Sequence, residues 1–238
     1  MISRFIAKRL LIALLQLVGL ALAVFFLIRA LNADPVARLV GLNASPEAYK
    51  QSAQALGVDR PIFEQLAAFL GLIEGKPGLL QGSFGVSWVT NDSVMKELAS
   101  TLPVTIEIVT FSLLASFLLA LPLGLASARK PGGTADRISK FWGLFAGAQP
   151  DYWWGLLFVF IFYFLLNVAP PPMGRIDALL TEPRSITGFI TVDAILYGRV
   201  DVLLSAVHHL MLPVITLVFV ASGAILKMVR TNTLRALQ

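Results

Sequence analysis

The stretch that decides the fold is VTIEIVTFSLLASFLLALPLGLASA, residues 104–128, in which Glu107 is the only charged residue. A helix needs about 20 apolar residues to cross the core of a bilayer, so this stretch predicts a membrane span. Other apolar stretches of comparable length lie at residues 10–28, at residues 141–169 and between Asp201 and Lys227. The sequence therefore predicts an all-α membrane protein with about four transmembrane helices.

The composition indicates the same class of protein. Hydrophobic residues make up 57% of the 238 residues and charged residues only 14%, whereas a soluble domain has about 25% charged residues. These values exclude a soluble globular domain and an intrinsically disordered chain. The lack of cysteine excludes a disulfide scaffold, a thiolate zinc site and an iron–sulfur cluster, and two histidines are too few for a multi-histidine metal site. We therefore expect no metal and no cofactor.

We expect three parts along the chain. Residues 1–31 form an N-terminal transmembrane helix, because their apolar run is longer than the core of a signal peptide and no cleavage site follows. Residues 32–100 form a small helical segment outside the cytoplasm. Residues 101–238 form a transmembrane core, with spans at about 104–128, 138–169 and 203–229.

The third of the four spans is longer than one crossing needs. The 29 residues from 141 to 169 would extend about 43 Å as a straight helix. Gln149-Pro150-Asp151 interrupts them. Because proline lacks a backbone donor and clashes with the preceding turn, we expect one tilted helix that is kinked or broken at Pro150.

Basic residues are unevenly distributed among the segments that connect the spans. The N-terminus, the loop at 128–141 and the tail from Lys227 contain ten Lys and Arg residues and one acidic residue. Residues 32–100 and 170–202 together contain eight basic and eleven acidic residues. The positive-inside rule therefore predicts that both termini are cytoplasmic and that residues 32–100 are outside. This bias also explains the sequence pI of about 9.7 without a nucleic-acid partner.

Residues 32–100 are too polar for lipid and contain helix signals. Ser45, followed by proline, predicts the start of a helix, and Gly57 predicts its end. Asp59 can cap a second helix over residues 61–73, whose apolar side chains fall on one face. A segment of this size and charge fits a lid or docking surface better than an enzyme domain.

Shorter signals occur around the spans. A short amphipathic helix is expected at residues 93–101, leading to Pro103 and the second span. Gly124 and Gly223 are expected to allow close contact between helices. The run Pro131-Gly132-Gly133 lacks the Lys and the Ser or Thr of a nucleotide-binding P-loop, so it predicts a turn.

Several local patterns resemble the permease subunits of binding-protein-dependent ABC importers, in the dipeptide, oligopeptide and nickel group. The matching segments are Asn32-Ala33-Asp34-Pro35-Val36, Leu56-Gly57-Val58-Asp59-Arg60-Pro61, Gly82-Ser83-Phe84-Gly85-Val86-Ser87, Leu102-Pro103-Val104-Thr105-Ile106-Glu107, Pro122-Leu123-Gly124, Asp136-Arg137 and His209-Leu210-Met211-Leu212-Pro213. Ala33 stands where the family usually has glycine. Each segment alone is a weak signal, whereas their shared order along nearly the whole chain is specific.

The resemblance implies that residues 101–238 are the permease core of a six-span architecture. It implies import of a solute, most often a di- or oligopeptide, by alternating access through the inner membrane of a bacterium or archaeon. The implied partners are a second, similar permease, two cytoplasmic ATPase subunits and an extracytoplasmic solute-binding protein. The chain itself is then not an enzyme.

In the family pattern, a cytoplasmic Glu-Ala-Ala-like loop that docks on the ATPase follows the tail, and two further spans come after it. We therefore expect the chain to be either a fragment of a longer permease or the product of a truncated gene. By the same resemblance, Lys227, Arg230 and Arg235 are candidates for positions close to the ATPase.

Four residues are candidates for the translocation path, namely Glu107, Gln149, Pro150 and Asp151. An acidic residue inside a membrane rarely faces lipid, so Glu107 either faces a cavity or is an interfacial carboxylate bonded to water or to nearby backbone. The interruption at Pro150 either contacts solute or is a packing kink whose Asp151 caps the following helix. We favour a structural kink beside the path.

The histidines and the aromatic residues also have two interpretations each. His208 and His209 point about 100° apart on a helix, which favours hydrogen-bonding histidines over a shared metal ion. Trp142 and the aromatic residues at 152–154 are either a solute platform or an aromatic belt at the membrane surface, and the belt is the commoner arrangement.

Two rival functions have less support. A membrane-embedded enzyme needs two polar groups at one depth, whereas Glu107 and His209 lie near outer span ends and Asp151 lies deeper. A stand-alone secondary transporter is expected to have internal repeats and several buried charges, and the sequence has neither.

Overall fold

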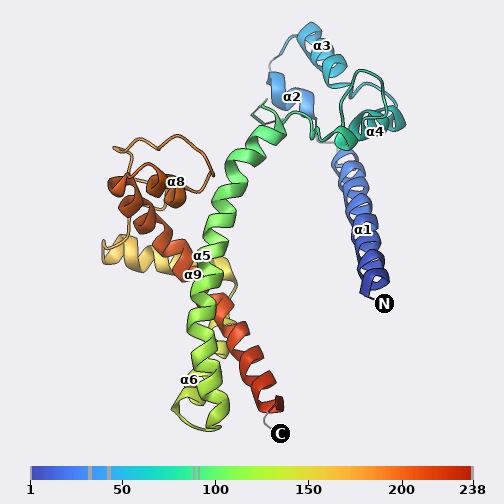
Figure 1. The fold of residues 1–238 in the computed structure, drawn as a ribbon. Helices are drawn as coiled ribbons and strands as arrows, with labels where there is room; N and C mark the ends of the chain where they lie inside the picture. The colour runs from blue at the N-terminus through green and yellow to red at the C-terminus, as the bar shows by residue number, and fades with distance from the viewer. Residues whose placement is uncertain (1, 32–33, 42–43, 88, 91, 237–238) are drawn as a thin grey trace. The chain divides into compact units, whose positions relative to one another are not determined.

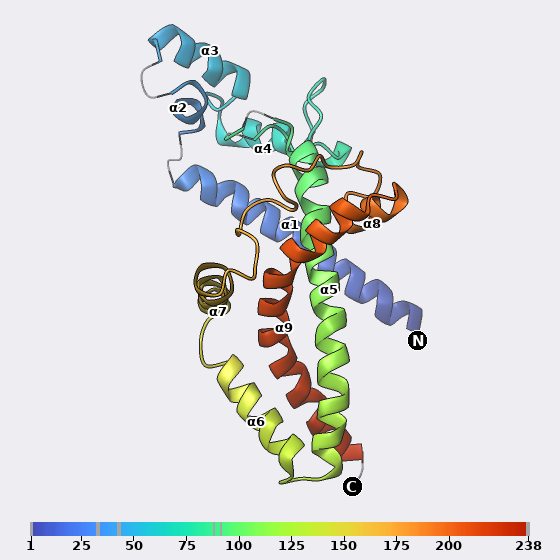
Figure 2. The ribbon, with the colours of Figure 1, turned by 90° about the vertical axis from the view of Figure 1, so that its left-hand side faces the viewer.

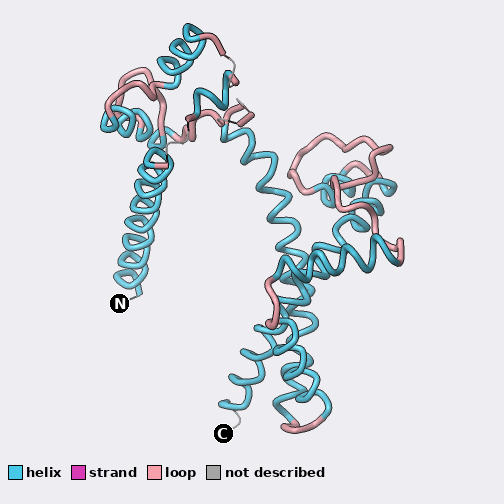
Figure 3. The backbone as a smooth tube through the Cα atoms, turned by 180° about the vertical axis from the view of Figure 1, so that it is seen from behind, coloured by secondary structure: helices cyan, strands magenta, loops and turns pink. Residues whose placement is uncertain are grey.

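The computed structural model describes residues 2–31, 34–41, 44–87, 89–90 and 92–236, which form helices and connecting loops (Figure 3). Among these residues the only strand-like pairing is an isolated bridge between Val86 and Ser93. Within the described residues, three helices are long and apolar enough to cross a membrane: Arg4–Ala30, Val94–Arg129 and Val200–Ala236. The predicted all-α membrane fold is thus confirmed. The chain divides into two compact units, residues 1–98 and residues 99–238.

The first unit consists of one long helix and several short ones (Figure 1). Its elements are α1 (Ile2–Ala30), α2 (Pro35–Val40), α3 (Pro46–Leu56), α4 (Ile62–Leu70) and the 3₁₀ turn η1 (Leu79–Gln81). Asp34 precedes α2, and its carboxylate accepts hydrogen bonds from the backbone N–H groups of Val36 and Ala37. Asn32 and Ala33, which begin the first family-like segment, lie outside the described residues.

The ends of α3 are the ones that the sequence predicts. The Ser45 hydroxyl accepts a hydrogen bond from the backbone N–H of Ala48 at 3.2 Å, and Pro46 is the first helical residue. At the other end, Gly57 adopts a left-handed conformation with φ of 68°. Both ends therefore follow from local residue chemistry alone.

The prediction for α4 is wrong at both ends. The residue before the helix is Pro61, with no capping side chain, and Asp59 does not cap it. The helix stops at Leu70 because Gly71 turns the chain with φ of 82°. The chain then comes back so that Gly78 packs against the backbone of Gly71. A Cβ atom on Gly78 would lie 2.2 Å from the backbone nitrogen of Gly71, so this approach requires glycine.

The second candidate span is one continuous helix, α5 (Val94–Arg129). It begins before the predicted span. It also includes residues 94–101, which the sequence predicts as part of a separate helix at 93–101. Pro103 lies inside α5 and does not end it. The prediction of two helices is therefore wrong here, because proline removes one bond from the ladder while the turns on either side continue.

The second unit is organised around its last helix, α9 (Val200–Ala236), which packs against α6 (Thr134–Ala146), α7 (Asp151–Phe158) and α8 (Ile190–Leu196) (Figures 1 and 2). Two glycines allow close packing. A Cβ atom on Gly124 of α5 would lie 2.8 Å from Cγ1 of Val229. A Cβ atom on Gly223 would lie 3.5 Å from the Cα atom of Gly143. Both glycines singled out in the sequence therefore lie at helix contacts.

The third apolar stretch is not one helix. α6 ends at Ala146, α7 begins at Asp151, and α7 continues into the π-helical segment η2 (Val159–Leu165). The break predicted at Pro150 is confirmed, since the residue before a proline is pushed away from helical geometry. The apolar helix after the break, Asp151–Leu165, is shorter than the three candidate spans. A fourth crossing therefore stays a prediction.

Candidate functional site

The break between α6 and α7 presents three of the predicted path residues. Gln149, Pro150 and Asp151 are all exposed in this chain. Asp151 is the first residue of α7, and no side chain caps that helix, so the capping role predicted for Asp151 is wrong. An anion in a first helical turn is nevertheless favoured by the helix dipole. At the break, the amide of Gln149 and the carboxylate of Asp151 therefore lie near the backbone N–H and C=O groups that have no partner within a helix end.

Aromatic side chains hold both halves of the broken helix against α9. The indole nitrogen of Trp154 donates to the last carbonyl of α6 at 3.2 Å. Trp142 donates to the carbonyl of Phe219 at 3.1 Å, and the ring centres of Trp154 and Phe219 are 4.6 Å apart. Trp154 is therefore buried and Trp142 partly buried in contacts within the chain, whereas Tyr152 and Trp153 are exposed, and the belt and the platform both stay predictions.

A cavity of about 470 Å³ lies beside the broken helix. Gly155 of α7, Val159 of η2 and the part of α9 around Pro213 contribute to its lining. Two polar side chains among its described lining residues, His209 and Thr216, already contact the backbone of α9 one turn earlier, at 2.9 and 2.8 Å. The cavity therefore offers a mainly apolar surface whose size suits a small ligand.

Glu107 is buried and anchors the segment around α8. Its side chain accepts hydrogen bonds from the backbone N–H and the hydroxyl of Thr191, at 2.9 and 2.5 Å. Arg175 pairs with its other oxygen at 3.1 Å and also donates to the carbonyl of Gly188 at 2.9 Å. These contacts attach α8 and the loop before it to α5. They favour the interpretation of Glu107 as a carboxylate bonded to neighbouring protein.

The adjacent histidines contact different protein groups. His208 Nε2 lies 3.1 Å from the carbonyl of Val168, and His209 Nε2 lies 4.0 Å from a carboxylate oxygen of Asp177. No group of three metal-ligating side chains occurs in the part of the chain that the structure describes. The Ser205 hydroxyl donates to Asp177 at 2.9 Å and not to a histidine, so these residues do not form a nucleophile–base pair.

Asp136, in the first turn of α6, is fully buried and accepts hydrogen bonds from four donors. Arg230 Nε lies 2.5 Å away, the backbone N–H of Gly132 2.8 Å, the Lys140 ammonium 2.9 Å and the Ser127 hydroxyl 2.9 Å. The pKa of Asp136 is lowered, chiefly by the hydrogen bond from Arg230 and then by Gly132 and Lys140. This cluster ties the turn between α5 and α6 to the C-terminal part of α9.

Sequence reasoning names Arg230 as a site candidate, but it names Asp136 only as part of a family-like segment. Lys227 and Arg235, the other basic candidates, are exposed on α9. The signal for Asp136 is present in the sequence, because it is the only acidic residue among the ten Lys and Arg residues of the three basic segments. Residues 237 and 238 of the same tail lie outside the described residues.

Two family models match consecutive parts of the chain. Residues 1–109 match the N-terminal region of binding-protein-dependent transport system membrane components. Residues 120–238 match the binding-protein-dependent transport system inner membrane component. The chain belongs to this family. This permease is therefore a multi-helix transport component of an inner membrane and not an enzyme, and the resemblance seen in the sequence is confirmed.

Curated relatives of the permease share most of its length. The probable D,D-dipeptide transport system permease protein DdpB of Escherichia coli is 31% identical over 223 residues, covering 94% of this chain and 64% of the relative. The di/tripeptide transport system permease protein DppB of Pseudomonas aeruginosa is 31% identical, covering 98% and 68%. The dipeptide transport system permease protein DppB of Escherichia coli is 26% identical, covering 98% and 68%. The permease thus spans about two thirds of the length of these relatives.

Family membership assigns a role to the permease and not to single residues. The path role of Glu107, Gln149, Pro150 and Asp151 and the coupling role of Lys227, Arg230 and Arg235 stay predictions. Geometry adds two observations to them. The polar residues at the break, Gln149 and Asp151, are exposed. The basic end of α9 is fixed to α6 by the hydrogen bond from Arg230 to the buried carboxylate of Asp136.

Proposed function

We propose that this permease is a membrane subunit of an ATP-driven importer of di- and oligopeptides, which forms part of the solute path by alternating access. The observation that carries the proposal is the match of both halves of the chain to consecutive models of one family. Relatives named as dipeptide and di/tripeptide permeases support peptides as the solute. The broken helix supports a path, because irregular backbone at membrane depth is tolerated beside protein or a wet cavity.

The importer needs further subunits. The run Pro131-Gly132-Gly133 is not a nucleotide-binding loop, so ATP hydrolysis belongs to two cytoplasmic ATPase subunits. A second, similar permease completes the path, since a bundle of three or four spans encloses little space. An extracytoplasmic binding protein delivers the peptide. Both termini are cytoplasmic, in agreement with the excess of basic residues in the segments on that side.

The peptide path passes the break between α6 and α7. At this point the carboxylate of Asp151 can attract the α-ammonium group of a peptide, and the amide of Gln149 can bond to its backbone. The neighbouring cavity near Pro213 can receive an apolar side chain. Charged groups at membrane depth are costly, which supports a functional role for a carboxylate in this position.

Coupling to the ATPases involves the basic end of α9. Lys227 and Arg235 are exposed there and are available to a partner. Arg230 instead pairs with Asp136 and links α9 to the turn between α5 and α6. Movement imposed on that turn by an ATPase is thereby passed to the helix that packs against the broken α6–α7 pair.

Uptake of a labelled dipeptide tests the proposal in cells that lack other peptide permeases. Disrupting the gene is expected to abolish energy-dependent uptake of dialanine and to leave uptake of alanine unchanged. Asp151→Asn is expected to lower dialanine uptake about tenfold, the loss of one charge-assisted contact. The matched control is Asp201→Asn, which removes a carboxylate from the first turn of α9 and is expected to change uptake less than about twofold. Unchanged dialanine uptake in the disrupted strain would contradict the proposal.

A further inference from the structure

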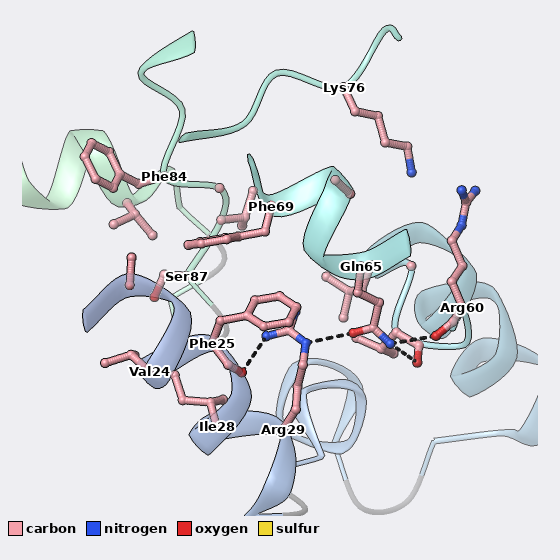
Figure 4. Close-up of a pocket in the computed structure, with 18 of the residues that line it drawn as sticks. Val24, Phe25, Ile28, Arg29, Arg60, Gln65, Phe69, Lys76, Phe84 and Ser87 are labelled. Carbon is pink, nitrogen blue, oxygen red and sulfur yellow. Dashed lines mark hydrogen bonds between the residues drawn. The ribbon is translucent and has the colours of Figure 1, made fainter. Parts of the chain in front are cut away.

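We propose that the first unit binds an anionic phospholipid in a groove beside the C-terminal end of α1. The groove has a volume of about 900 Å³ and is lined by α1, the turn after α3, α4 and the loop that contains Phe84 and Ser87 (Figure 4). This volume lies within the usual range of ligand sites. The inference is independent of the proposed transport activity.

One wall of the groove is apolar and lies in the spanning part of α1. Leu17, Leu20, Ala21, Val24 and Ile28 contribute to it. Their spacing of three and four residues places them on one face of the helix. All five belong to the candidate span Arg4–Ala30, so this wall lies at the depth of lipid tails. It therefore fits an acyl chain.

The other end of the groove is strongly basic. Arg29, Arg38, Arg60 and Lys76 belong to its lining, and the lining includes no Asp or Glu among the described residues. None of the four forms an ion pair with a described carboxylate. Figure 4 shows the charged ends of Arg60 and Lys76 on the same side of the groove. Uncompensated cations at one end of an apolar groove attract an anion.

Arg29 is held in position by protein contacts. Its guanidinium carbon lies 3.5 Å from the ring centre of Phe25, and its Nε donates to the side-chain oxygen of Gln65 at 2.9 Å. The amide nitrogen of Gln65 in turn donates to the carbonyls of Val58 and Arg60, at 3.0 and 2.8 Å (Figure 4). Among the described residues, Nη2 of Arg29 has no partner. A fixed guanidinium with a free donor suits a phosphate oxygen.

An anionic phospholipid satisfies both ends of the groove together. Arg29 lies in the last turn of α1, where a span meets the headgroup layer. A phosphodiester there accepts hydrogen bonds from Arg29 and is attracted by Arg60 and Lys76, while an acyl chain covers the apolar wall. A transmembrane helix from another subunit would cover the wall but leave the cations unpaired. Free phosphate would pair with the cations but leave the wall uncovered.

Native mass spectrometry of the intact transporter complex tests the proposal. The complex is offered equal amounts of phosphatidylglycerol and phosphatidylcholine, and the retained lipids are compared. We expect preferential retention of phosphatidylglycerol. The double variant Arg60→Gln/Lys76→Gln is expected to lose about fivefold in retention for each charge removed. The matched control, Lys50→Gln/Lys96→Gln, removes two exposed cations of the same unit that do not line the groove. It is expected to retain the lipid as the unaltered complex does.

Several results would overturn the proposal. One is equal retention of both lipids, and another is equal loss in the groove variant and in the control. The third is a cross-link from Val24→Cys to another subunit in the complex, which would show a protein segment in the groove. Ala21→Phe provides a second test that keeps every charge, because it fills the apolar wall and is expected to weaken retention of phosphatidylglycerol. Displacement of the lipid by millimolar inorganic phosphate would assign the site to the free anion instead.

Discussion

The guanidinium of Arg230 donates to the carboxylate of Asp136 across 2.5 Å, although 94 positions separate the two residues in the chain. Asp136 belongs to the first turn of α6, and Arg230 lies in the C-terminal part of α9. The pair therefore fixes the end of the second unit at which α5, α6 and α9 come together (Figure 2). We expect a movement of the turn between α5 and α6 to be transmitted through this contact to the basic end of α9.

Removing the charge of Asp136 is expected to destabilise the purified protein in a pH-dependent way. Because the folded-state pKa of Asp136 lies below that of an unfolded aspartate, the contribution of its charge to stability is fully present above about pH 4 and is lost as the pH falls further. The melting temperature of Asp136→Asn should therefore lie below that of the unaltered chain from pH 8 to pH 5, and the difference should shrink below about pH 4.

Asp201→Asn serves as the comparison for that experiment. Asp201 forms an exposed ion pair with Arg199 at 2.7 Å, and such pairs contribute little to stability. Its melting temperature should stay close to that of the unaltered chain at neutral pH. An equal decrease for Asp136→Asn and Asp201→Asn would contradict a special role of the buried cluster.

Two glycines at helix contacts are expected to respond differently to alanine. At Gly124 the added Cβ would lie 2.8 Å from the side chain of Val229, so Gly124→Ala should cost about 1–3 kcal/mol of stability. The additional change Val229→Ala should recover most of this loss. At Gly223 the nearest atom would lie at 3.5 Å, an ordinary contact, so Gly223→Ala should be tolerated. Thermal unfolding in detergent measures the stability of all three variants. An equal loss of stability for Gly124→Ala and Gly223→Ala would show that the contacts are wrongly assigned.

Glu107 is expected to act on stability and not on solute affinity. Its removal leaves the charge of Arg175 without its carboxylate partner and the Thr191 N–H without its acceptor, so Glu107→Ala should cost about 3–5 kcal/mol. A double-mutant cycle of Glu107→Gln and Arg175→Gln should give a coupling of about 0.5–3 kcal/mol. Uptake per folded complex should keep its KM. A raised KM with unchanged stability would instead place Glu107 in the path.

The proposed orientation predicts opposite accessibility for two exposed positions. Gln54 of α3 and Thr134 of α6 are both exposed, and the chain has no natural cysteine to interfere with thiol labelling. In intact cells, an impermeant thiol reagent should label Gln54→Cys and should reach Thr134→Cys only after the membrane is opened. Equal labelling of both positions in intact cells would contradict the orientation.

Elements with local signals could be predicted from the sequence. The long spans follow from apolar length, the ends of α3 from Ser45 and Gly57, and the break between α6 and α7 from Pro150. One wrong prediction concerns a helix end whose position depends on a segment that returns later in the chain. The end of α4 depends on Gly78 returning to Gly71, which no local pattern records.

The polar clusters were harder to predict for the same reason. Glu107 is bonded to Thr191, 84 residues away, and Asp136 to Arg230, so neither pairing leaves a periodic pattern in the sequence. The capping role of Asp151 was a reasonable local prediction, yet the helix begins at Asp151 itself, one residue too late for it to serve as cap. Composition and order of motifs predicted the family, while only the three-dimensional arrangement identifies the buried anchors.

We propose that a peptide passes the break between α6 and α7, and protection of a cysteine at Gln149 from labelling is the sharpest test of this path. The complete importer carrying Gln149→Cys is placed in nanodiscs, and its labelling rate with an impermeant thiol reagent is measured with and without dialanine, binding protein and ATP. We predict that these additions slow labelling at Gln149→Cys severalfold and leave labelling at Thr134→Cys unchanged. Labelling at Gln149→Cys that is the same under both conditions would contradict the claim.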